Sequence, residues 1–383
     1  MIRLTPKGVR RWRTGHPWIF RSDVEGNAEA GALVGVHDAG GRQLGVAAWS
    51  STSQISVRRL PLLPDEDPET GWWRLVDGAL NRRVGGPPSV RLINGDADGL
   101  PGLIVDRYGD GIALQTLSQA AERRKDALIE RLVARYAPRV VVLRNDPKVR
   151  DHEALPREKR VVYGEDPVVI APFGGLAYRF DLLDGQKTGG FLDQQANQVA
   201  AAAFAVAGLE PGTEALDCFS YQGGFALALA ARGARVTAVD QSGPALALLK
   251  DNAARNDLAV EALEANVFDL LRDFDHTNRR FQTVVLDPPA FVPGRKALEA
   301  GRRAYKEINL RALKLLVPGG RLITCSCSAH MPRADFEAMV AEAAGDAGRF
   351  VRVVERRQAG PDHPTVLTAP ETDYLKVLFL DVL

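Results

Sequence analysis

The sequence predicts an α/β protein whose C-terminal half forms an open, mostly parallel sheet, and three stretches carry this prediction. Residues 214–231 read as an apolar strand, a glycine turn and the start of an apolar helix. A second apolar strand ends in Asp240, about 20 residues past that turn. A third apolar run, residues 281–286, is stopped by Asp287 and two prolines, which end regular structure in a rigid turn.

The glycine turn is predicted to bind a nucleoside. Gly223 and Gly224 permit a tight turn, and a carboxylate placed like Asp240 binds ribose hydroxyls in open α/β sheets. The turn lacks the G-x-G-x-x-G pattern and no G-K-[ST] follows, so nothing provides the close backbone approach that a pyrophosphate needs. A ribose-bearing ligand without phosphates therefore fits better.

These motifs together carry a resemblance. Asp217-x-Phe-x-Tyr-x-Gly-Gly-Phe225, Asp240 and Asp-Pro-Pro-Ala-Phe291 resemble class I S-adenosylmethionine-dependent methyltransferases. The resemblance implies a Rossmann-like, seven-stranded sheet and S-adenosylmethionine as the cofactor. The last two strands, 350–356 and 374–380, are joined without a helical crossover, so we expect this pair to be antiparallel.

Composition bounds the remaining possibilities. With 383 residues, 45% of them hydrophobic, the chain has enough core for two or three domains. The formal net charge of +1 gives no general attraction to nucleic acid, so RNA contacts must come from local patches. No apolar run approaches the roughly 18 residues that span a membrane and no apolar signal core is present, which predicts a cytoplasmic protein. The three cysteines form no metal-ligand set, so we expect no metal and a reducing compartment.

The N-terminal segment is predicted to be a small β module. Residues 33–37 and 43–49 flank a glycine turn, and residues 54–60 alternate with strand period. Basic residues interleaved with aromatics precede the module, which suits phosphate contacts and base stacking, although a solvated face explains the same pattern. The basic residues predicted to bind RNA here are Arg10, Arg11, Arg13 and Arg21. Lys7-Gly-x-x-Arg10 and Gly15-His-Pro-Trp-Ile-Phe20 resemble the entry to a PUA domain, a small β-barrel that binds RNA in many modification enzymes.

A middle segment is predicted to be a small α/β domain. Residues 112–117 and 140–144 read as strands, and residues 120–136 read as one amphipathic helix. The segment resembles the small domain between the PUA and catalytic domains of bacterial ribosomal RNA methyltransferases. The predicted domains are a PUA-like RNA-binding domain at 1–70, a central α/β domain at 71–180 and a methyltransferase domain at 181–383.

A polar, glycine-rich loop at residues 185–195 ends where an alanine-rich helix begins, at about Asp193. Such a loop at a helix N-terminus can receive a donor tail, whereas Asp193 or Thr188 as an ordinary helix cap is the alternative. In the resembling family this loop touches the methionine part of the donor. The adenine ring would be gripped near Asn266 and Phe268, although a Phe at a strand end is more often core. The predicted donor-binding residues are Lys187, Thr188, Asp193, Gln194, Asp217, Phe219, Tyr221, Gly223, Gly224, Asp240, Gln241, Asn266, Phe268, Asp269, Asp287 and Pro288.

The predicted strand 321–328 carries two cysteines two positions apart, so both point to one face of the sheet. Only Cys327 lies at the carboxyl end of the strand, where the ligand crevice of an open sheet is found. A thiolate that adds to C6 of a pyrimidine makes C5 electron-rich enough to be methylated, so Cys327 is the predicted nucleophile and Cys325 a core residue. The alternative for both is a small, inert core hydrophobe.

Further motifs sharpen the resemblance to bacterial large-subunit ribosomal RNA cytosine-5 methyltransferases. They are Gln186-Lys-Thr-Gly189, Leu192-Asp-Gln194, Tyr305-Lys-x-x-Asn309 and Cys325-Ser-Cys-Ser328. The resemblance implies methylation of C5 of a cytidine in 23S rRNA, with Cys327 and Asp287 as catalytic residues and Asp287 holding the N3/N4 edge of cytosine. Ala290 is a departure, because many members of the broader class place a second cysteine after the Asp-x-Pro turn. Another base must then remove the C5 proton.

Two other functions stay open at this point. One is N-methylation of a guanine at the Asp-Pro-Pro turn, and the other is a non-catalytic RNA-binding factor in ribosome assembly, against which the intact acidic and glycine residues argue. Basic residues after the turn either bind RNA phosphates near a flipped base or form a solvated face. Those predicted to bind RNA are Arg295, Lys296 and Arg302. The expected partner is 23S rRNA or a pre-50S particle, not a membrane, and a homodimer is one option for the assembly.

Overall fold

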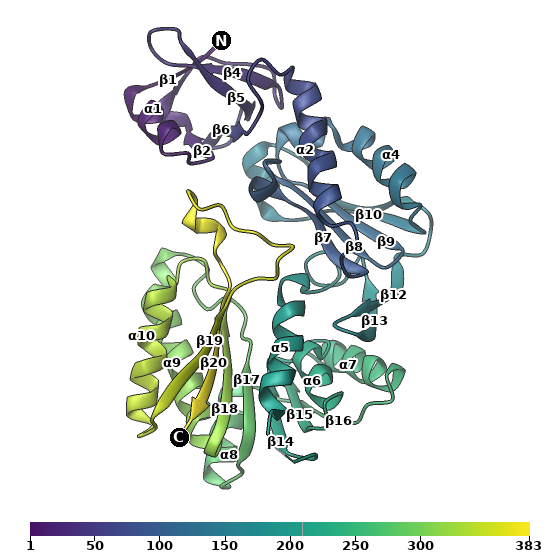
Figure 1. The fold of residues 1–383 in the computed structure, drawn as a ribbon, viewed down its shortest axis with the longest axis vertical. Coiled ribbons are helices and arrows are strands. Elements are labelled where there is room, and N and C mark those ends of the chain that lie inside the picture. The colour runs from purple at the N-terminus through teal and green to yellow at the C-terminus, as the bar shows by residue number, and fades with distance from the viewer. Residues whose placement is uncertain (209) are drawn as a thin grey trace. The chain divides into compact units, whose positions relative to one another are not determined.

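The computed structural model describes residues 1–208 and 210–383, which divide into two compact units. The first unit comprises Met1–Pro172, Phe180–Leu192 and Pro361–Pro370. The second comprises Phe173–Arg179, Asp193–Gly360 and Glu371–Leu383. Figure 1 follows the chain by colour from the purple N-terminus to the yellow C-terminus. A short segment near the C-terminus therefore belongs to the same unit as the N-terminal residues.

The N-terminal part of the first unit is a β module with one short helix. Its strands pair in the order β2-β6-β5-β4-β1-β3. The elements are β1 (Ile2–Leu4), α1 (Pro6–Arg13), β2 (Trp18–Phe20), β3 (Val24–Glu25), β4 (Leu33–His37), β5 (Gln43–Trp49) and β6 (Ile55–Leu60). Helix α1 begins where the Thr5 hydroxyl accepts a hydrogen bond from the Gly8 N–H at 3.2 Å. The predicted hairpin is confirmed by the antiparallel pairing of β4 with β5.

A second sheet, in the order β11-β10-β9-β8-β7, forms the other half of the first unit. Its elements are α2 (Pro68–Arg82), β7 (Ser89–Asn94), β8 (Leu103–Tyr108), β9 (Gly111–Thr116), α3 (Gln119–Arg123), α4 (Lys125–Tyr136), β10 (Val140–Asn145) and β11 (Glu158–Tyr163). Trp72 and Val76 of α2 pack in one apolar cluster with Ala48 and Leu60 of the β module. The two sheets therefore share a core. The predicted boundaries at residues 70 and 180 stay predictions.

The single helix expected at residues 120–136 is instead two helices. Helix α3 ends at Arg123 and α4 begins at Lys125, because Arg124 takes a non-helical φ of −108° and ψ of 8°. The Arg124 guanidinium group donates to the carboxylate of Glu69 and to the carbonyl oxygen of Gly31 at 3.2 Å. These contacts with distant parts of the unit override the helical pattern of the sequence. Strands β12 (Val168–Phe173) and β13 (Leu176–Asp181) follow as a two-stranded sheet.

The second unit is built on a sheet of seven strands within the described residues, in the order β16-β15-β14-β17-β18-β20-β19. The strands are β14 (Glu214–Cys218), β15 (Arg235–Asp240), β16 (Val260–Glu264), β17 (Phe281–Leu286), β18 (Leu316–Ser326), β19 (Val351–Arg357) and β20 (Lys376–Val382). Strands β14 to β18 run parallel, and β20 is antiparallel to β18 and β19. The predicted antiparallel last pair is thus confirmed. Asp217, Asp240 and Asp287 consequently lie at the same end of the sheet, where parallel strands finish.

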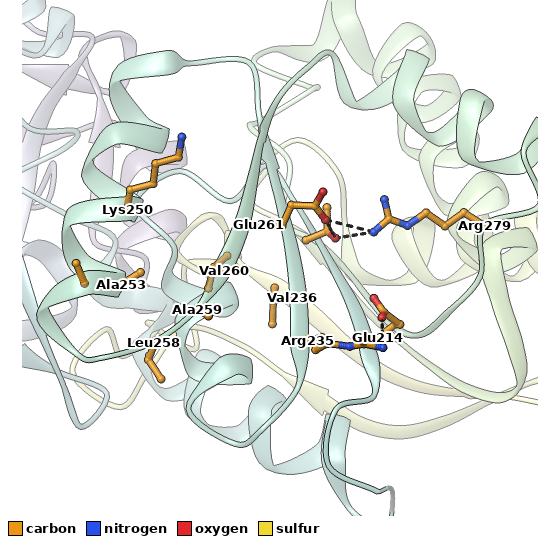
Figure 2. A pocket seen from close by; sticks show the side chains of 12 residues that line it. Glu214, Arg235, Val236, Lys250, Ala253, Leu258, Ala259, Val260, Glu261 and Arg279 are labelled. Atoms are coloured by element: carbon orange, nitrogen blue, oxygen red, sulfur yellow. Dashed lines mark hydrogen bonds and ion pairs between the residues drawn. The ribbon is translucent and has the colours of Figure 1, made fainter.

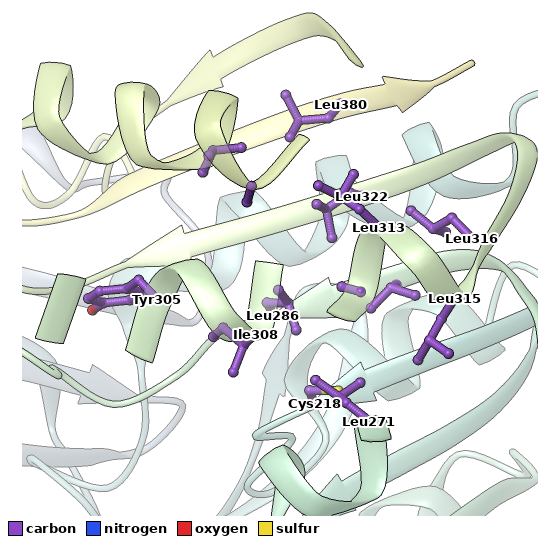
Figure 3. Packing of buried hydrophobic residues seen from close by; sticks show 14 of the residues in the cluster. Cys218, Leu271, Leu286, Tyr305, Ile308, Leu313, Leu315, Leu316, Leu322 and Leu380 are labelled. Atoms are coloured by element: carbon purple, nitrogen blue, oxygen red, sulfur yellow. The ribbon is translucent and has the colours of Figure 1, made fainter. Parts of the chain in front are cut away.

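Helices cover both faces of this sheet (Figure 1). One face carries α8 (Val267–His276), α9 (Leu298–Leu315) and α10 (Arg333–Asp346), and the other carries α5 (Gln195–Val206), α6 (Gly224–Ala230) and α7 (Gly243–Arg255). Figure 3 shows the first core, in which Ile308 and Leu313 of α9 meet Leu286 and Leu322 of the strands. Burial on both faces explains why the central strands read as nearly continuous apolar runs. Within residues 1–208 and 210–383, no helix is long and apolar enough to cross a membrane.

Candidate active site

The turn between β14 and α6 is held in an unusual backbone conformation. Phe219 and Tyr221 both have positive φ angles, 64° and 46°, which non-glycine residues rarely adopt and which cost of the order of 1–3 kcal/mol each. The Tyr221 N–H donates to Oδ2 of Asp240 at 2.9 Å, and the Ser242 N–H donates to Oδ1 at 2.9 Å. The carboxylate at the end of β15 thus fixes the turn. Strain of this kind is typical of ligand-binding turns.

The two glycines of the turn are required by packing. Gly223 has a φ of +91°, and a Cβ there would lie 2.9 Å from the Leu249 side chain. A Cβ on Gly224 would lie 2.1 Å from Nε2 of Gln198 on α5. Close contact of α6 with its neighbours therefore accounts for both glycines. Their predicted contact with the donor stays a prediction.

Three carboxylates gather at this end of the sheet without a matching cation among the groups that act on them. Asp217 is 1% exposed, and its Oδ2 accepts a hydrogen bond from the Ala226 N–H at 2.9 Å. Its Oδ1 is buried and has no hydrogen-bond partner among the described residues. Burial, followed by the charges of Asp287 and Asp240, raises the pKa of Asp217 well above its usual value. An orphaned, buried acceptor among three acids fits a cationic ligand.

Asp287 is oriented by a chain of amides. Nε2 of Gln194 donates to Oδ1 of Asp287 at 2.9 Å, and Oε1 of Gln194 accepts from Nδ2 of Asn197 at 2.8 Å. Asn197 in turn donates to the carbonyl oxygen of Gln358 at 3.0 Å. Gln194, predicted as a donor contact, therefore acts on the Asp-Pro-Pro turn in the structure. Asn197 was missed from the sequence because a polar residue inside an alanine-rich helix resembles a solvent-exposed position.

The three cysteines differ sharply in exposure. Cys218 and Cys325 are 0% exposed, whereas Cys327 is only partly buried. Sγ of Cys327 donates to the carbonyl oxygen of Pro288 at 3.8 Å, so the thiol lies against the Asp-Pro-Pro turn. Burial, with Asp217 or Asp287 nearby, raises the pKa of Cys218 and Cys325 well above the usual value. Only Cys327 therefore has the access that a nucleophile needs.

Comparisons with known proteins agree with this geometry. Family models match residues 2–61 as a PUA-like domain and residues 165–380 as an S-adenosylmethionine-dependent methyltransferase. A Serratia proteamaculans protein named Ribosomal RNA large subunit methyltransferase I is 38% identical over 376 residues, covering 94% of each chain. A protein of the same name from Shewanella denitrificans is 37% identical and covers 98% of each chain. The chain belongs to this methyltransferase family.

Solved structures support the fold. A candidate SAM-dependent methyltransferase from Streptococcus mutans has a TM-score of 0.81 at 19% identity, covering 99% of each chain. A methyltransferase structure in complex with SAH has a TM-score of 0.82 at 21% identity over the whole of both chains. The predicted PUA-like module and Rossmann-like methyltransferase sheet are thereby confirmed. S-adenosylmethionine is the cofactor of the family, and the acidic end of the sheet fits its positive charge.

Two residues of the predicted donor loop already have interaction partners within the first unit. The Thr188 hydroxyl donates to Oδ2 of Asp106 at 2.7 Å and lies 2.9 Å from the Tyr108 hydroxyl. Lys187 is exposed, and its Nζ lies 4.6 Å from the centre of the Phe191 ring. Their predicted donor contacts stay predictions.

The loop residue Asp193 lies at the start of the second unit. Its Oδ2 accepts a hydrogen bond from the Tyr374 hydroxyl at 2.6 Å, and its carbonyl oxygen accepts from the Gly360 N–H at 3.0 Å. The N-cap of α5 is Gln194, and no side chain caps the helix. The alternative that Asp193 or Thr188 caps this helix is therefore wrong.

The residues predicted to grip adenine have local duties in the structure. Oδ1 of Asn266 caps α8 by accepting from the Phe268 N–H at 2.9 Å, and Asp269 pairs with Arg272 at 3.2 Å. The Phe268 ring packs against Phe291 with 5.9 Å between ring centres. Gln241 is exposed beside Asp240. Any donor contact would come in addition to these roles and stays a prediction.

The predicted RNA-binding residues fall into two groups. Arg11 and Arg21 are partly buried and donate to the carbonyl oxygens of Trp18 and Ser50, respectively, each at 2.7 Å. Arg302 is ion-paired with Glu342. The exposed members are Arg10, Arg13, Arg295 and Lys296. The exposed group is free of the structural duties seen for the first group, and RNA binding stays a prediction for all of them.

Two further side chains near Cys327 were missed from the sequence. The Tyr305 hydroxyl lies 2.9 Å from Oγ of Ser328, and that oxygen accepts from the Val292 N–H at 3.0 Å. The motif Tyr305-Lys-x-x-Asn309 thus ties α9 to the end of β18. Lys376 is 1% exposed at the start of β20. A lysine at the start of a largely apolar strand was the available signal for it.

A shallow, open pocket of about 660 Å³ lies at the opposite end of the sheet, among the amino ends of β14, β15 and β16 (Figure 2). Arg235 pairs with Glu214 at 2.7 Å, and Arg279 pairs with Glu261 at 3.3 Å. Open α/β sheets bind ligands at their carboxyl ends, and the two arginines of this pocket are already ion-paired. The pocket is therefore separate from the candidate active site.

Proposed function

We propose that the protein methylates C5 of a cytidine in 23S ribosomal RNA, with S-adenosylmethionine as methyl donor and Cys327 as nucleophile. The relatives named Ribosomal RNA large subunit methyltransferase I support the substrate class. The observation that carries the proposal is the placement of Cys327. It is the one partly exposed cysteine among the described residues, and its Sγ contacts the Pro288 carbonyl oxygen at 3.8 Å.

The thiol supplies what cytosine C5 lacks. The Cys327 thiolate forms a bond to C6, and the electrons of the C5–C6 double bond make C5 a nucleophile. S-adenosylmethionine supplies an electrophilic methyl group on a sulfonium ion. Once C5 carries the methyl group, its proton leaves to a base, the C6–S bond breaks and the thiolate is regenerated. Neither Cys218 nor Cys325 can replace Cys327, because both are fully buried.

Asp287 is proposed to hold the cytosine edge, accepting a hydrogen bond from the N4 amino group. Gln194 keeps the carboxylate in place through the 2.9 Å hydrogen bond to Oδ1. Asp240 adds negative charge near the cationic donor, and the positive charge of the donor favours the ionised form of Asp217, so donor binding is favoured over binding of the neutral product. A donor contact at Asp217 would also satisfy its orphaned Oδ1.

RNA is proposed to contact the exposed basic residues of the PUA-like module and of the segment after the Asp-Pro-Pro turn. Arg10 and Arg13 lie on α1, and Arg295 and Lys296 precede α9. Each pair gives a local positive charge within its own unit, on a chain whose net charge is only +1. The substrate is 23S rRNA, free or within a pre-50S particle, which places the reaction in the cytoplasm.

Methylation mapping tests this function. Protein-free 23S rRNA and a pre-50S particle are each incubated with labelled donor and either wild type, Cys327→Ala or the matched control Cys325→Ala, and the product is mapped by mass spectrometry. We expect 5-methylcytidine with the wild type and with Cys325→Ala, and none with Cys327→Ala. Methylated guanine, or full activity in Cys327→Ala, contradicts the proposal. RNA containing 5-fluorocytidine adds a second readout, because a donor-dependent covalent adduct forms only by the cysteine route.

A further inference from the structure

A buried lysine lies beside the proposed nucleophile. Lys376 opens β20, where it pairs in antiparallel register with Ser326, the residue before Cys327. Its side chain is 1% exposed. Nζ donates to the carbonyl oxygen of Ser328 at 2.7 Å and to that of Tyr374 at 2.8 Å. The ammonium group therefore links the backbone of Ser328, the residue after Cys327, to the backbone of Tyr374.

The charge of this lysine is costly to bury. Burial lowers the pKa of Lys376 to about 8, against the opposing effects of Asp373 and Cys327, while Arg333 adds to the lowering. Asp373 is itself paired with Arg333 at 3.5 Å, so the carboxylate is shared. No bidentate ion pair to Lys376 occurs among the described residues. A buried ammonium without its own carboxylate needs a physical reason, since burying an apolar residue in a strand costs less.

Cys327 is the side chain on which the charge of Lys376 can act. The two side chains interact electrostatically, and the sign of that interaction favours the ammonium ion together with the thiolate. Other groups that contact or interact with Cys327 are the Tyr305 hydroxyl, which is held by Ser328, the buried Cys325 thiol and the Pro288 carbonyl oxygen. These three are uncharged, and Asp287 at the same turn is negative. Lys376 is thus a positive group that opposes the acids around the thiol.

We infer that Lys376 is a positioning residue for the nucleophile, whose buried ammonium group stabilises the thiolate form of Cys327. The catalytic value of that thiolate rests on the proposed function, but the electrostatic pairing does not. The Cys327 thiol loses its proton to solvent before attack, and Lys376 keeps its own proton throughout. When the C6–S bond breaks at the end of the reaction, the negative charge returns to sulfur beside the same ammonium ion.

Alkylation of Cys327 in the full-length protein without RNA tests the pairing directly. The rate of reaction with iodoacetamide is measured from pH 5.5 to 10 for the wild type, Lys376→Arg, Lys376→Gln and Lys376→Met, with mass spectrometry locating the label. Cys218 and Cys325 are fully buried, so they contribute little signal. Lys306→Met removes a positive charge from α9, where Lys306 pairs with Asp346 at 2.8 Å, and serves as the charge-matched control.

We expect the rate at pH 7 to fall roughly tenfold in Lys376→Gln and Lys376→Met and to stay near the wild-type rate in Lys376→Arg and Lys306→Met. The midpoint of the curve of rate against pH should move to higher pH, by the same tenfold factor when expressed as proton concentration. A structural role alone would change the rate by one factor at every pH. Identical pH profiles in wild type and Lys376→Gln would overturn the inference.

The wild type decides the matter if the substituted proteins do not fold. A midpoint of the wild-type rate curve below about pH 8.5, the pKa of a free cysteine, supports the pairing, and a midpoint at or above that pH overturns it. The methylation assay separates the two proposals. If wild type and Lys376→Gln have the same midpoint pH and the wild type still forms 5-methylcytidine, only the role of Lys376 is rejected. If the midpoints differ but the product is methylated guanine, only the proposed function is rejected.

Discussion

Charged residues at the two ends of the seven-stranded sheet have opposite surroundings, being paired with counter-charges at one end and crowded by like charges at the other. At the amino ends, Arg235 pairs with Glu214 and Arg279 with Glu261, and these side chains are between 34% and 73% exposed. At the carboxyl ends, Asp217, Asp240 and Asp287 lie close enough for their charges to raise the pKa of Asp217. The amino end also holds an open hollow of about 660 Å³.

The contrast shows which end is prepared for chemistry. Paired charges in water are close to their lowest free energy, so they contribute little to stability and have little capacity to bind. Crowded acids, an orphaned Oδ1 on Asp217 and two left-handed residues in the turn all raise the free energy of the unliganded protein. A cationic donor bound at this end would relieve that cost. The hollow alone would have pointed to the wrong end of the sheet.

The largest expected effect comes from removing an acid at the carboxyl end. Asp287→Ala should lower kcat by about a hundredfold to a thousandfold, because the cytosine edge loses its hydrogen-bond acceptor and Gln194 loses its partner. Steady-state methylation of 23S rRNA measures the change. Glu261→Ala, at the amino end of the same sheet, is the matched control and should keep wild-type kcat. Equal losses in the two variants would erase the distinction between the ends.

Asp217→Asn should separate binding from stability. The amide can still accept from the Ala226 N–H, but it lacks the charge, so the affinity for S-adenosylmethionine should fall about tenfold or more. The raised pKa of Asp217 means that the wild type loses stability as pH rises through that pKa, because the folded state holds the proton longer. The amide does not titrate.

Calorimetric binding and urea unfolding at pH 5 and pH 8, both without RNA, measure these two effects of Asp217→Asn. Its free energy of unfolding relative to wild type should be higher at pH 8 than at pH 5. Unchanged donor affinity would remove Asp217 from the donor site.

Lys376→Met should change how stability depends on pH. In the wild type the pKa of Lys376 is about 8 when folded and 10.5 when unfolded, so the unfolded chain binds more protons between those values. Wild-type stability should therefore gain up to about 3 kcal/mol from this group as pH rises from 8 to 10.5. Urea unfolding of both proteins across that range gives the difference. If the free energies of unfolding of the two proteins change with pH in parallel, the pKa of Lys376 is not lowered by folding.

The smallest effect is expected at the amino end. The Arg235 side chain is 73% exposed, so Arg235→Ala should cost about 0.5 kcal/mol or less, and less still at high salt. Methylation should stay at the wild-type level. Thermal unfolding at low and high ionic strength, with the activity assay alongside, measures both. A loss of activity would place a function in the amino-end pocket.

Sequence patterns predicted the local elements well. Strand β15 begins and ends where the apolar run 235–240 does, and β17 follows 281–286 in the same way. The failure at residues 120–136 is instructive, because Arg124 breaks the helix to reach Glu69 and Gly31, which are distant in sequence. Periodicity reports on neighbours along the chain and cannot report such contacts.

The features of the candidate site also divide into those that the sequence could predict and those that it could not. Asp217, Asp240, Asp287 and Cys327 could be placed from the sequence, since strand ends and the two-residue period fix where such side chains emerge. The hydrogen bond from Gln194 to Asp287, the cap formed by Asn266 and the duty of Thr188 beside Asp106 depend on which segments meet. No pattern in the sequence carries that information.

By itself, the sequence determined that this protein has a parallel sheet ending in acids, a cysteine at the carboxyl end of its fifth strand and a basic β module before it. Short-range backbone preferences and apolar periodicity are sufficient for those features. The tertiary structure alone decided that Cys325 is fully buried while Cys327 is partly exposed, and that Lys376 is buried against the backbone next to Cys327. Burial and electrostatic partners are sums over the whole fold, so they exist only once distant segments have packed.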